Sequence, residues 1–346
     1  MTSAKTAFFL IFISCAAIAA PQDDLFLEAR EAFQRGDILK LNERASKLDD
    51  DYPLTPYVRY WQLRSHLADL SSAEIQAFLA KHESSLVADR MRADWLRQLA
   101  RNAEWESFLR EYGKLGTADT ELACYASQAK LARGDSGVLS QARPLWFNAQ
   151  ALPDSCLPIF QAMFDKEILT AEDSWSRVRL ALENGNLANA KLLLMYLPLA
   201  QRLDVKLLES TAKRPQRYLD KVPLLLKTRG QRELAIYAVY KTAENWPEIA
   251  SDHLRSFADK LADEERAYAW AQLASVAARN LHTGALTWFE NAGSGMSDRQ
   301  WSSYARAALR AGEWAGVLTA VNSMSNVERS RPQWRYWRAR ALMALG

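Results

Sequence analysis

Cys124 and Cys156 are the residues of this 346-residue sequence whose chemistry is easiest to foresee. The third cysteine, Cys15, lies in an amino-terminal segment with the features of a secretory leader, so cleavage of that segment would leave an even pair. An even pair in an exported chain favours a disulfide, which would close a loop of about 33 residues and stabilise the fold by roughly 3–4 kcal/mol. The alternative is two separate buried thiols. Neither cysteine has a CxxC neighbour, so redox catalysis is not supported.

The other reactive side chains form no known catalytic or metal-binding pattern. The four histidines share no ligand spacing: His66, His82, His253 and His282. The sequence therefore predicts no metal and no cofactor. Gly293 and Gly295 form a lone GxG without the third glycine of a nucleotide fingerprint, which predicts a loop between helices. Carboxylates are plentiful, but most are expected on solvated helix faces shared with Lys and Arg, so no acid/base pair and no catalytic residue is assigned.

Aromatic and basic side chains suggest two possible binding surfaces. The twelve tryptophans could stack on sugars, but large rings also fill the wedge between tilted helices, and this packing is the favoured interpretation. It is applied to Trp95, Trp105, Trp146, Trp175, Trp246, Trp270, Trp288, Trp301 and Trp314. Five arginines between positions 329 and 340 would suit an anionic polymer, although one face of an exposed helix is favoured there. The net charge of +3 is too small to indicate a nucleic-acid partner.

These side chains must be positioned by helices, because the sequence shows helical spacing and helix caps but no sustained alternation. Gly and Pro together make up about 7% of the chain, against an average near 12%, which argues against an all-β fold. Ser71 with Glu74 and Ser297 with Gln300 predict capping boxes, and Thr55 is expected to cap a helix that starts at Pro56. Spacing also predicts one buried face for Trp175, Val178 and Leu182, and a second helix running from Leu187 to Leu197.

A helix–glycine–helix unit recurs along the chain. It is expected at Gly36, Gly134, Gly185 and Gly312, where glycine would supply a left-handed helix end without steric cost. Gly346 follows Gly312 by 34 residues, the period of a tetratricopeptide repeat, while the earlier spacings are irregular. The predicted fold is therefore all-α, a degenerate TPR-like solenoid in which antiparallel helical hairpins stack into a superhelix.

The amino terminus is expected to be a cleavable signal peptide over residues 1–19, followed by one superhelical domain over 20–346. Lys5 supplies the positive charge, a short apolar run follows, and Ala17 and Ala19 form the small-x-small pattern before the cut. The apolar run is too short for a membrane anchor. The protein is thus expected to be exported and not to be an integral membrane protein. A lipoprotein modified at Cys15 is the less favoured alternative.

Two segments resemble signature motifs of one enzyme family. The segment DYPLTPYVRYW at 51–61, with Tyr52, Pro53, Pro56 and Tyr57, looks like the YPLxPYLxY signature of soluble lytic murein transglycosylases. The segment WRYWRARAL at 334–342, with Trp334, Tyr336 and Trp337, closely resembles the family's WRYWxAxAL segment. Between them, Trp105, Cys124, Trp146 and Cys156 follow the family's order and approximate spacing.

The resemblance implies a periplasmic enzyme that cleaves the β-1,4 bond between N-acetylmuramic acid and N-acetylglucosamine and leaves a 1,6-anhydro end. It implies a U-shaped superhelix at the amino terminus, in which the positions matching Cys124 and Cys156 are bridged. One Glu of a lysozyme-like carboxy-terminal domain carries the family's chemistry, in a Glu-Ser-x-x-Asn-Pro motif. The Glu-Ser pairs here, at Glu83, Glu106 and Glu209, lack the Asn-Pro and are expected in helical contexts, so no catalytic role is transferred.

The leading hypothesis is therefore the superhelical domain of such an enzyme, without the linker and catalytic domains and inactive alone. Its partners would be the peptidoglycan glycan strand and other cell-wall enzymes. A stand-alone periplasmic TPR-like scaffold that binds proteins is the alternative. An intact enzyme with an unrecognised site is the least favoured hypothesis, since no catalytic constellation was found.

Overall fold

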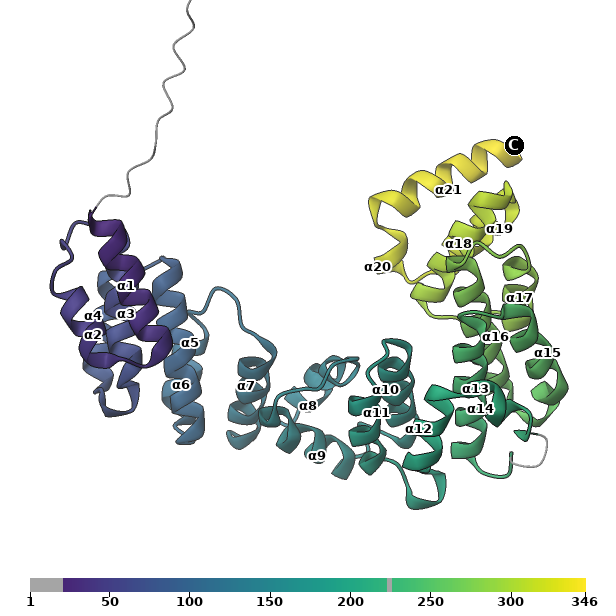
Figure 1. Cartoon of the computed structure of the whole chain (residues 1–346), viewed down its shortest axis with the longest axis horizontal. Coiled ribbons are helices and arrows are strands. Elements are labelled where there is room, and N and C mark those ends of the chain that lie inside the picture. Colours follow the sequence, from purple (N-terminus) through teal and green to yellow (C-terminus); the bar gives the residue numbers. More distant parts are fainter. Residues whose placement is uncertain (1–20, 223–225) are drawn as a thin grey trace, which may run out of the picture. The chain divides into compact units, whose positions relative to one another are not determined.

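The computed structural model describes residues 21–222 and 226–346, so the predicted signal peptide and Cys15 lie outside the described residues. The described residues are helices and their connections, with no strand among them (Figure 1). This confirms the predicted all-α class. The contacts divide the chain into two compact units. The first unit runs up to Leu145 and includes Leu152–Ile168, and the second unit comprises Trp146–Ala151 and Leu169–Gly346.

The first unit contains nine α-helices among its described residues. They are α1 (Pro21–Arg35), α2 (Ile38–Ala45), α3 (Thr55–Ser65), α4 (Ser72–Lys81), α5 (Leu86–Arg101), α6 (Trp105–Tyr112), α7 (Thr120–Ala132), α8 (Val138–Ala142) and α9 (Leu157–Asp165). Helices α1, α3, α5 and α7 contact one another in succession, while α2 and α6 fold back onto them. Each hairpin therefore buries its apolar face on its neighbour, as expected for a solenoid.

The second unit repeats this arrangement. Its helices are α10 (Ala171–Glu183), α11 (Leu187–Leu193), α12 (Val205–Lys213), α13 (Pro215–Leu219), α14 (Arg229–Ala243), α15 (Pro247–Phe257), α16 (Asp263–Arg279), α17 (Ala285–Ala292), α18 (Asp298–Ala311), α19 (Trp314–Ser323), α20 (Asn326–Arg329) and α21 (Pro332–Leu345). Helices α14, α16 and α18 pack side by side, each paired with the helix that follows it (Figure 1).

Glycine turns form at the four predicted hairpins. Gly36, Gly134, Gly185 and Gly312 have φ of +71°, +89°, +71° and +72°. At Gly312, the amide donates to the Leu309 carbonyl and the Glu313 amide to the Ala308 carbonyl, which closes the helix end in a Schellman motif. Both predicted capping boxes, at Ser71 and Ser297, are also present.

Two helix boundaries differ from the predictions. The N-cap of α3 is Leu54 and not Thr55, because the Thr55 hydroxyl donates to the Asp49 carbonyl at 2.8 Å and Pro56 takes the second helical position. The predicted helix from Leu187 to Leu197 ends as an α-helix at Leu193 and tightens into a 3-10 turn over Leu194–Tyr196. Pro198 comes directly after Leu197 and disfavours helical backbone at that residue.

Most tryptophans fill spaces between helices, as predicted. Trp95, Trp146, Trp175, Trp270, Trp288 and Trp301 are all buried. Trp105 and Trp314 are partly buried. Trp246 does not follow the prediction: it is 51% exposed, because it lies in the turn before α15.

Candidate functional site

A cavity of about 750 Å³ lies between α10, α16 and α18 of the second unit. Its wall is rich in hydrogen-bonding side chains, including Arg179, Glu183, Tyr268, Gln272 and Arg299. Glu183 is the last residue of α10, and Tyr268 and Gln272 lie one turn apart on the same face of α16. The capping box at Ser297 starts α18 beside the cavity and so places Arg299 in its first turn.

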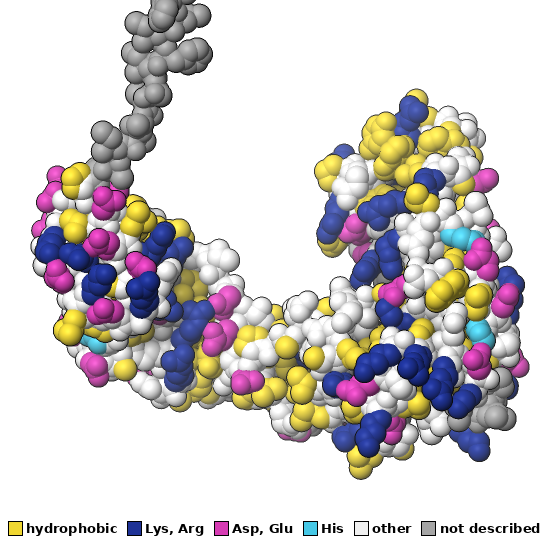
Figure 2. All heavy atoms as spheres, in the orientation of Figure 1, with side chains coloured by type: hydrophobic (Ala, Val, Ile, Leu, Met, Phe, Trp, Pro, Cys, Tyr) yellow, Lys and Arg dark blue, Asp and Glu magenta, His cyan; other side chains and the backbone are white. Residues whose placement is uncertain are grey.

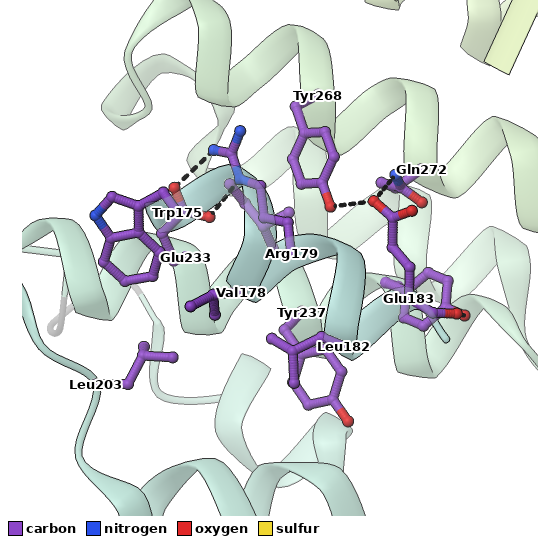
Figure 3. A pocket seen from close by; sticks show the side chains of 12 residues that line it. Trp175, Val178, Arg179, Leu182, Glu183, Leu203, Glu233, Tyr237, Tyr268 and Gln272 are labelled. Carbon is purple, nitrogen blue, oxygen red and sulfur yellow. Dashed lines mark hydrogen bonds and ion pairs between the residues drawn. The ribbon is translucent and has the colours of Figure 1, made fainter. Parts of the chain in front are cut away.

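The Glu183 carboxylate is the centre of this polar wall. Its Oε1 accepts hydrogen bonds from the Tyr268 hydroxyl at 2.6 Å and from the Gln272 amide at 2.5 Å (Figure 3). Arg299 lies 3.6 Å from the other carboxylate oxygen. Burial raises the pKa of the Glu183 carboxyl above its ordinary value, and this outweighs the Tyr268 hydrogen bond and the nearby arginines, which act in the opposite direction.

An ion pair between Arg179 and Glu233 lies next to the Tyr268 ring of this wall. The guanidinium donates to both carboxylate oxygens, at 2.8 and 2.6 Å, and lies over the Tyr268 ring at 4.0 Å from its centroid (Figure 3). Burial opposes the charge of Arg179, but Glu233 outweighs this effect and raises the pKa of the guanidinium. Arg229 adds contacts to Glu172, Glu233 and Glu265. The network therefore fixes the Tyr268 ring that holds Glu183.

The apolar side of the same region is closed. The space there is only about 20 Å³, roughly the room for one water. Its apolar lining consists of Trp175, Val178, Leu182, Leu203 and Tyr237 (Figure 3). A ligand larger than a water molecule therefore does not fit on this apolar side of Glu183.

This arrangement is suited to binding a polar ligand. Glu183 is held by two donors, and the Ser297 hydroxyl is engaged in the capping box at 2.9 Å from Gln300. Asp263, another carboxylate of the cavity, pairs with Arg266 at 2.6 Å. Fixed donors and acceptors around an open cavity orient hydroxyl or amide groups of a ligand. In residues 21–222 and 226–346, no group of three His, Cys, Asp or Glu side chains is placed to hold a metal ion.

Replacing Glu183 with glutamine is expected to change the pH dependence of stability. The folded pKa lies above the unfolded value near 4.5, so ionisation of Glu183 destabilises the fold as pH rises above 4.5. Glutamine keeps an oxygen that accepts from Tyr268 and Gln272 but does not ionise. The melting temperature of Glu183→Gln relative to wild type should therefore increase between pH 4.5 and 7, as measured by thermal denaturation.

Glu209→Gln is the control for this measurement. A hydrogen bond from Lys191 lowers the pKa of Glu209, so its contribution to stability is present above pH 4.5 and is lost as pH falls. The control variant should therefore show the opposite trend. A difference between Glu183→Gln and wild type that stays constant with pH would contradict the assignment.

The predicted cysteine pair is joined in the structure. Cys124 of α7 and Cys156, directly before α9, form a disulfide with a Cα–Cα distance of 4.9 Å, and both are fully buried. The two cysteines belong to the first unit and link helices that also contact each other.

The residues of the first signature segment act in local packing. The Tyr52 hydroxyl donates to Asp23 at 2.6 Å. Pro56 lies in the first turn of α3, and the Tyr57 ring lies 5.7 Å from the Arg90 guanidinium. Pro53 is exposed in the preceding turn. These four residues therefore shape the start of α3, and the cavity is lined by none of them.

The second signature segment forms α21. Trp334 is buried, and its indole N–H donates to Glu328 at 2.8 Å. Tyr336 is 57% exposed and packs edge-on against Trp337, with ring centroids 5.0 Å apart. Of the nearby arginines, Arg329 donates to the Asn322 carbonyl and Arg331 pairs with Glu328. The segment thus packs α21 onto α19.

The three Glu-Ser pairs are not equivalent. Glu106 lies in α6 and pairs with Arg133 at 3.3 Å, and Glu209 lies in α12 and pairs with Lys191 at 2.7 Å. The prediction of a helical context is wrong for Glu83, which lies in the turn after α4, where Ser84 has a φ of +62°. Ser85 caps the start of α5, so the chain must turn between the end of α4 and Ser85, where Glu83 lies.

Sequence patterns did not identify Glu183, Tyr268 or Gln272. Glu183 and Tyr268 are 85 positions apart, so no short motif contains both. The only local signal is the Asn184-Gly185 turn, which ends α10 directly after Glu183.

Comparison with known proteins identifies related sequences. No protein-family profile matches the chain. It is 24% identical over 309 residues to the soluble lytic murein transglycosylase of Escherichia coli K12, an alignment covering 86% of this chain and 46% of that protein. The Salmonella typhimurium LT2 protein of the same name is 24% identical over 306 residues, with the same coverage. The chain thus spans about half the length of the curated relatives it matches.

Solved structures agree with the sequence comparison. An inactive mutant of the lytic transglycosylase Slt from Pseudomonas aeruginosa has a TM-score of 0.63 and 25% identity, covering 93% of this chain and 52% of that one. The 70-kDa soluble lytic transglycosylase of E. coli has a TM-score of 0.54 and 22% identity, covering 94% and 53%. The similarity to soluble lytic murein transglycosylases predicted from the sequence is therefore confirmed.

Proposed function

We propose that this chain, a relative of soluble lytic murein transglycosylases, is the superhelical part of a periplasmic enzyme that cleaves peptidoglycan without hydrolysis. Its function is to hold the glycan strand, and it has no transglycosylase activity by itself. The observation that carries this proposal is the alignment of 86% of the chain with 46% of the E. coli enzyme. In this proposal, the chain corresponds to about half of an enzyme that has the relatives' activity.

The chemistry of the described residues supports a binding role. The Glu-Ser pairs at Glu106 and Glu209 are engaged with basic partners and lack the family's catalytic motif. The cavity around Glu183 offers a carboxylate, an amide and a guanidinium at its wall. Such groups hydrogen-bond the hydroxyl and N-acetyl groups of a glycan. No helix of the described residues is both long and apolar enough to cross a bilayer.

The purified chain is expected to co-sediment with peptidoglycan sacculi but to release no anhydro-muropeptides from them. Products are measured by chromatography of the soluble fraction, with the E. coli enzyme as the positive control. Arg299→Ala removes a partly exposed cation of the cavity and should lower the bound fraction. Arg255→Ala, a surface arginine of α15 paired with Asp252, is the matched control and should bind as wild type does.

Measurable turnover by the purified chain would overturn the proposed inactivity. Absence of sacculus binding would remove the glycan-holding role. The alternative function, a periplasmic scaffold, would be favoured if the chain recovers a defined protein partner and does not bind sacculi.

A further inference from the structure

A strongly cationic groove lies between α12 and α13, away from the residues that line the Glu183 cavity. It has a volume of about 500 Å³ and is lined by Lys206, Lys213, Arg214, Arg217 and Lys221. We call this feature the cationic groove. Figure 2 shows Lys and Arg side chains gathered over the region where Figure 1 labels α12 and α13.

The cations of the cationic groove outnumber the carboxylates that line it. The five side chains are exposed, and within residues 21–222 and 226–346 none of them makes a hydrogen bond or an ion pair. The groove's carboxylate, Glu209, is engaged by Lys191 from α11 at 2.7 Å. Elsewhere in the unit, arginines such as Arg179 and Arg232 are matched by buried carboxylates. The groove therefore holds a local excess of positive charge in a chain whose net charge is only +3.

The floor of the groove contains a further unsatisfied group. Thr211 lines the groove and is 1% exposed, yet its hydroxyl has no hydrogen-bond partner in the structure. Buried polar groups without partners cost folding free energy. Clustered like charges likewise repel one another, and a concave surface of one sign concentrates the field on an oppositely charged ligand. The groove thus combines two destabilising features, an unsatisfied buried hydroxyl and a cluster of like charges.

The distribution of the cations indicates a ligand with several negative charges. They extend along both helices, and α12 alone, with nine residues, is about 13 Å long. An extended polypeptide covers this length with about four residues. A single phosphate would contact only part of the groove, and a flat lipid surface would not enter a concave one.

We propose that the cationic groove binds an acidic, extended segment of another protein. Its carboxylates would pair with the lysines and arginines of the cationic groove and displace their hydration. This inference goes beyond the proposed glycan-holding function and does not depend on it, because it uses different residues and a different class of ligand.

The test measures binding of a fluorescent oligo-glutamate peptide to the purified chain by anisotropy. The same peptide made of glutamine is the neutral control. Lys206→Glu with Arg217→Glu is expected to weaken binding of the acidic peptide by about tenfold or more, because two attractive contacts become repulsive. Lys206 lies in the first turn of α12, where glutamate suits the helix dipole, and Arg217 is an exposed residue of α13. Added salt should also weaken binding.

The control variant, Arg30→Glu with Lys166→Glu, makes the same change in net charge on exposed residues of the first unit. It should bind the acidic peptide as wild type does. The proposal is overturned if the acidic peptide does not bind, if glutamine binds equally well, or if both double variants weaken binding alike. It is also overturned if anionic phosphatidylglycerol vesicles bind through the groove while the peptide does not. Sacculus binding is measured for the groove variant as well. If this variant still binds sacculi, its loss of peptide binding is independent of the proposed glycan-holding function.

Discussion

Replacing Trp146 with alanine is expected to lower the free energy of unfolding by about 3–5 kcal/mol. Trp146 is fully buried, packs edge-on against Tyr196 at 5.0 Å, and lies 4.4 Å below the Arg177 guanidinium. Its indole N–H also donates to the Asp173 carbonyl at 2.9 Å. Alanine would leave a cavity, remove the surface on which Arg177 rests, and leave that carbonyl without this donor.

Trp246→Ala is the matched control for this prediction. The Trp246 side chain is 51% exposed, so its truncation should lower the free energy of unfolding by clearly less than truncation of Trp146. Urea denaturation followed by far-ultraviolet circular dichroism measures both variants. Equal effects at the two positions would contradict the view that burial between helices decides the contribution of each tryptophan.

Loss of the Cys124–Cys156 disulfide is expected to destabilise the first unit by about 3–4 kcal/mol. The bridge closes a loop with a sequence separation of 32, and removing it increases the conformational entropy of the unfolded chain. The double variant Cys124→Ala and Cys156→Ala should therefore unfold at lower urea concentration than the oxidised wild type.

Reduction provides the internal control for the disulfide. Dithiothreitol, added at equilibrium in denaturant, should lower the stability of wild type to nearly that of the double variant. The double variant itself should not respond, because Cys15 is the only cysteine left in its sequence. A loss below about 1 kcal/mol would show that helix packing, and not the covalent link, holds α7 and α9 together.

The helical hairpins were predictable where glycine forms the turn, and this explains why the repeat looked irregular. The Schellman pair of hydrogen bonds seen at Gly312 also closes α5 at Ala103 and α16 at Leu281. These two residues adopt φ of +54° and +61° without being glycine. A sequence pattern that relies on glycine omits such turns, because the surrounding packing imposes the strained backbone.

The tryptophans illustrate what spacing alone can predict. Helical periodicity identifies which rings point toward a neighbouring helix, and Trp95, Trp175 and Trp301 are buried accordingly. Trp246 belongs to a turn and escapes this rule, since exposure there depends on the path of the chain between α14 and α15.

By itself, the sequence determined the all-α class, the capping boxes at Ser71 and Ser297, the four glycine turns, the cysteine pairing expected of an exported chain and the family resemblance. The caps and turns depend on residues close together, and the cysteine pairing depends on the small number of cysteines in the chain. Only the tertiary structure decided that Glu183 meets Tyr268 and Gln272, and that five cations of α12, α13 and the residues beside α13 border one groove. The physical reason is that stacking brings together residues of different hairpins, and their hydrogen bonds and charges then depend on how the helices pack, which local spacing does not encode.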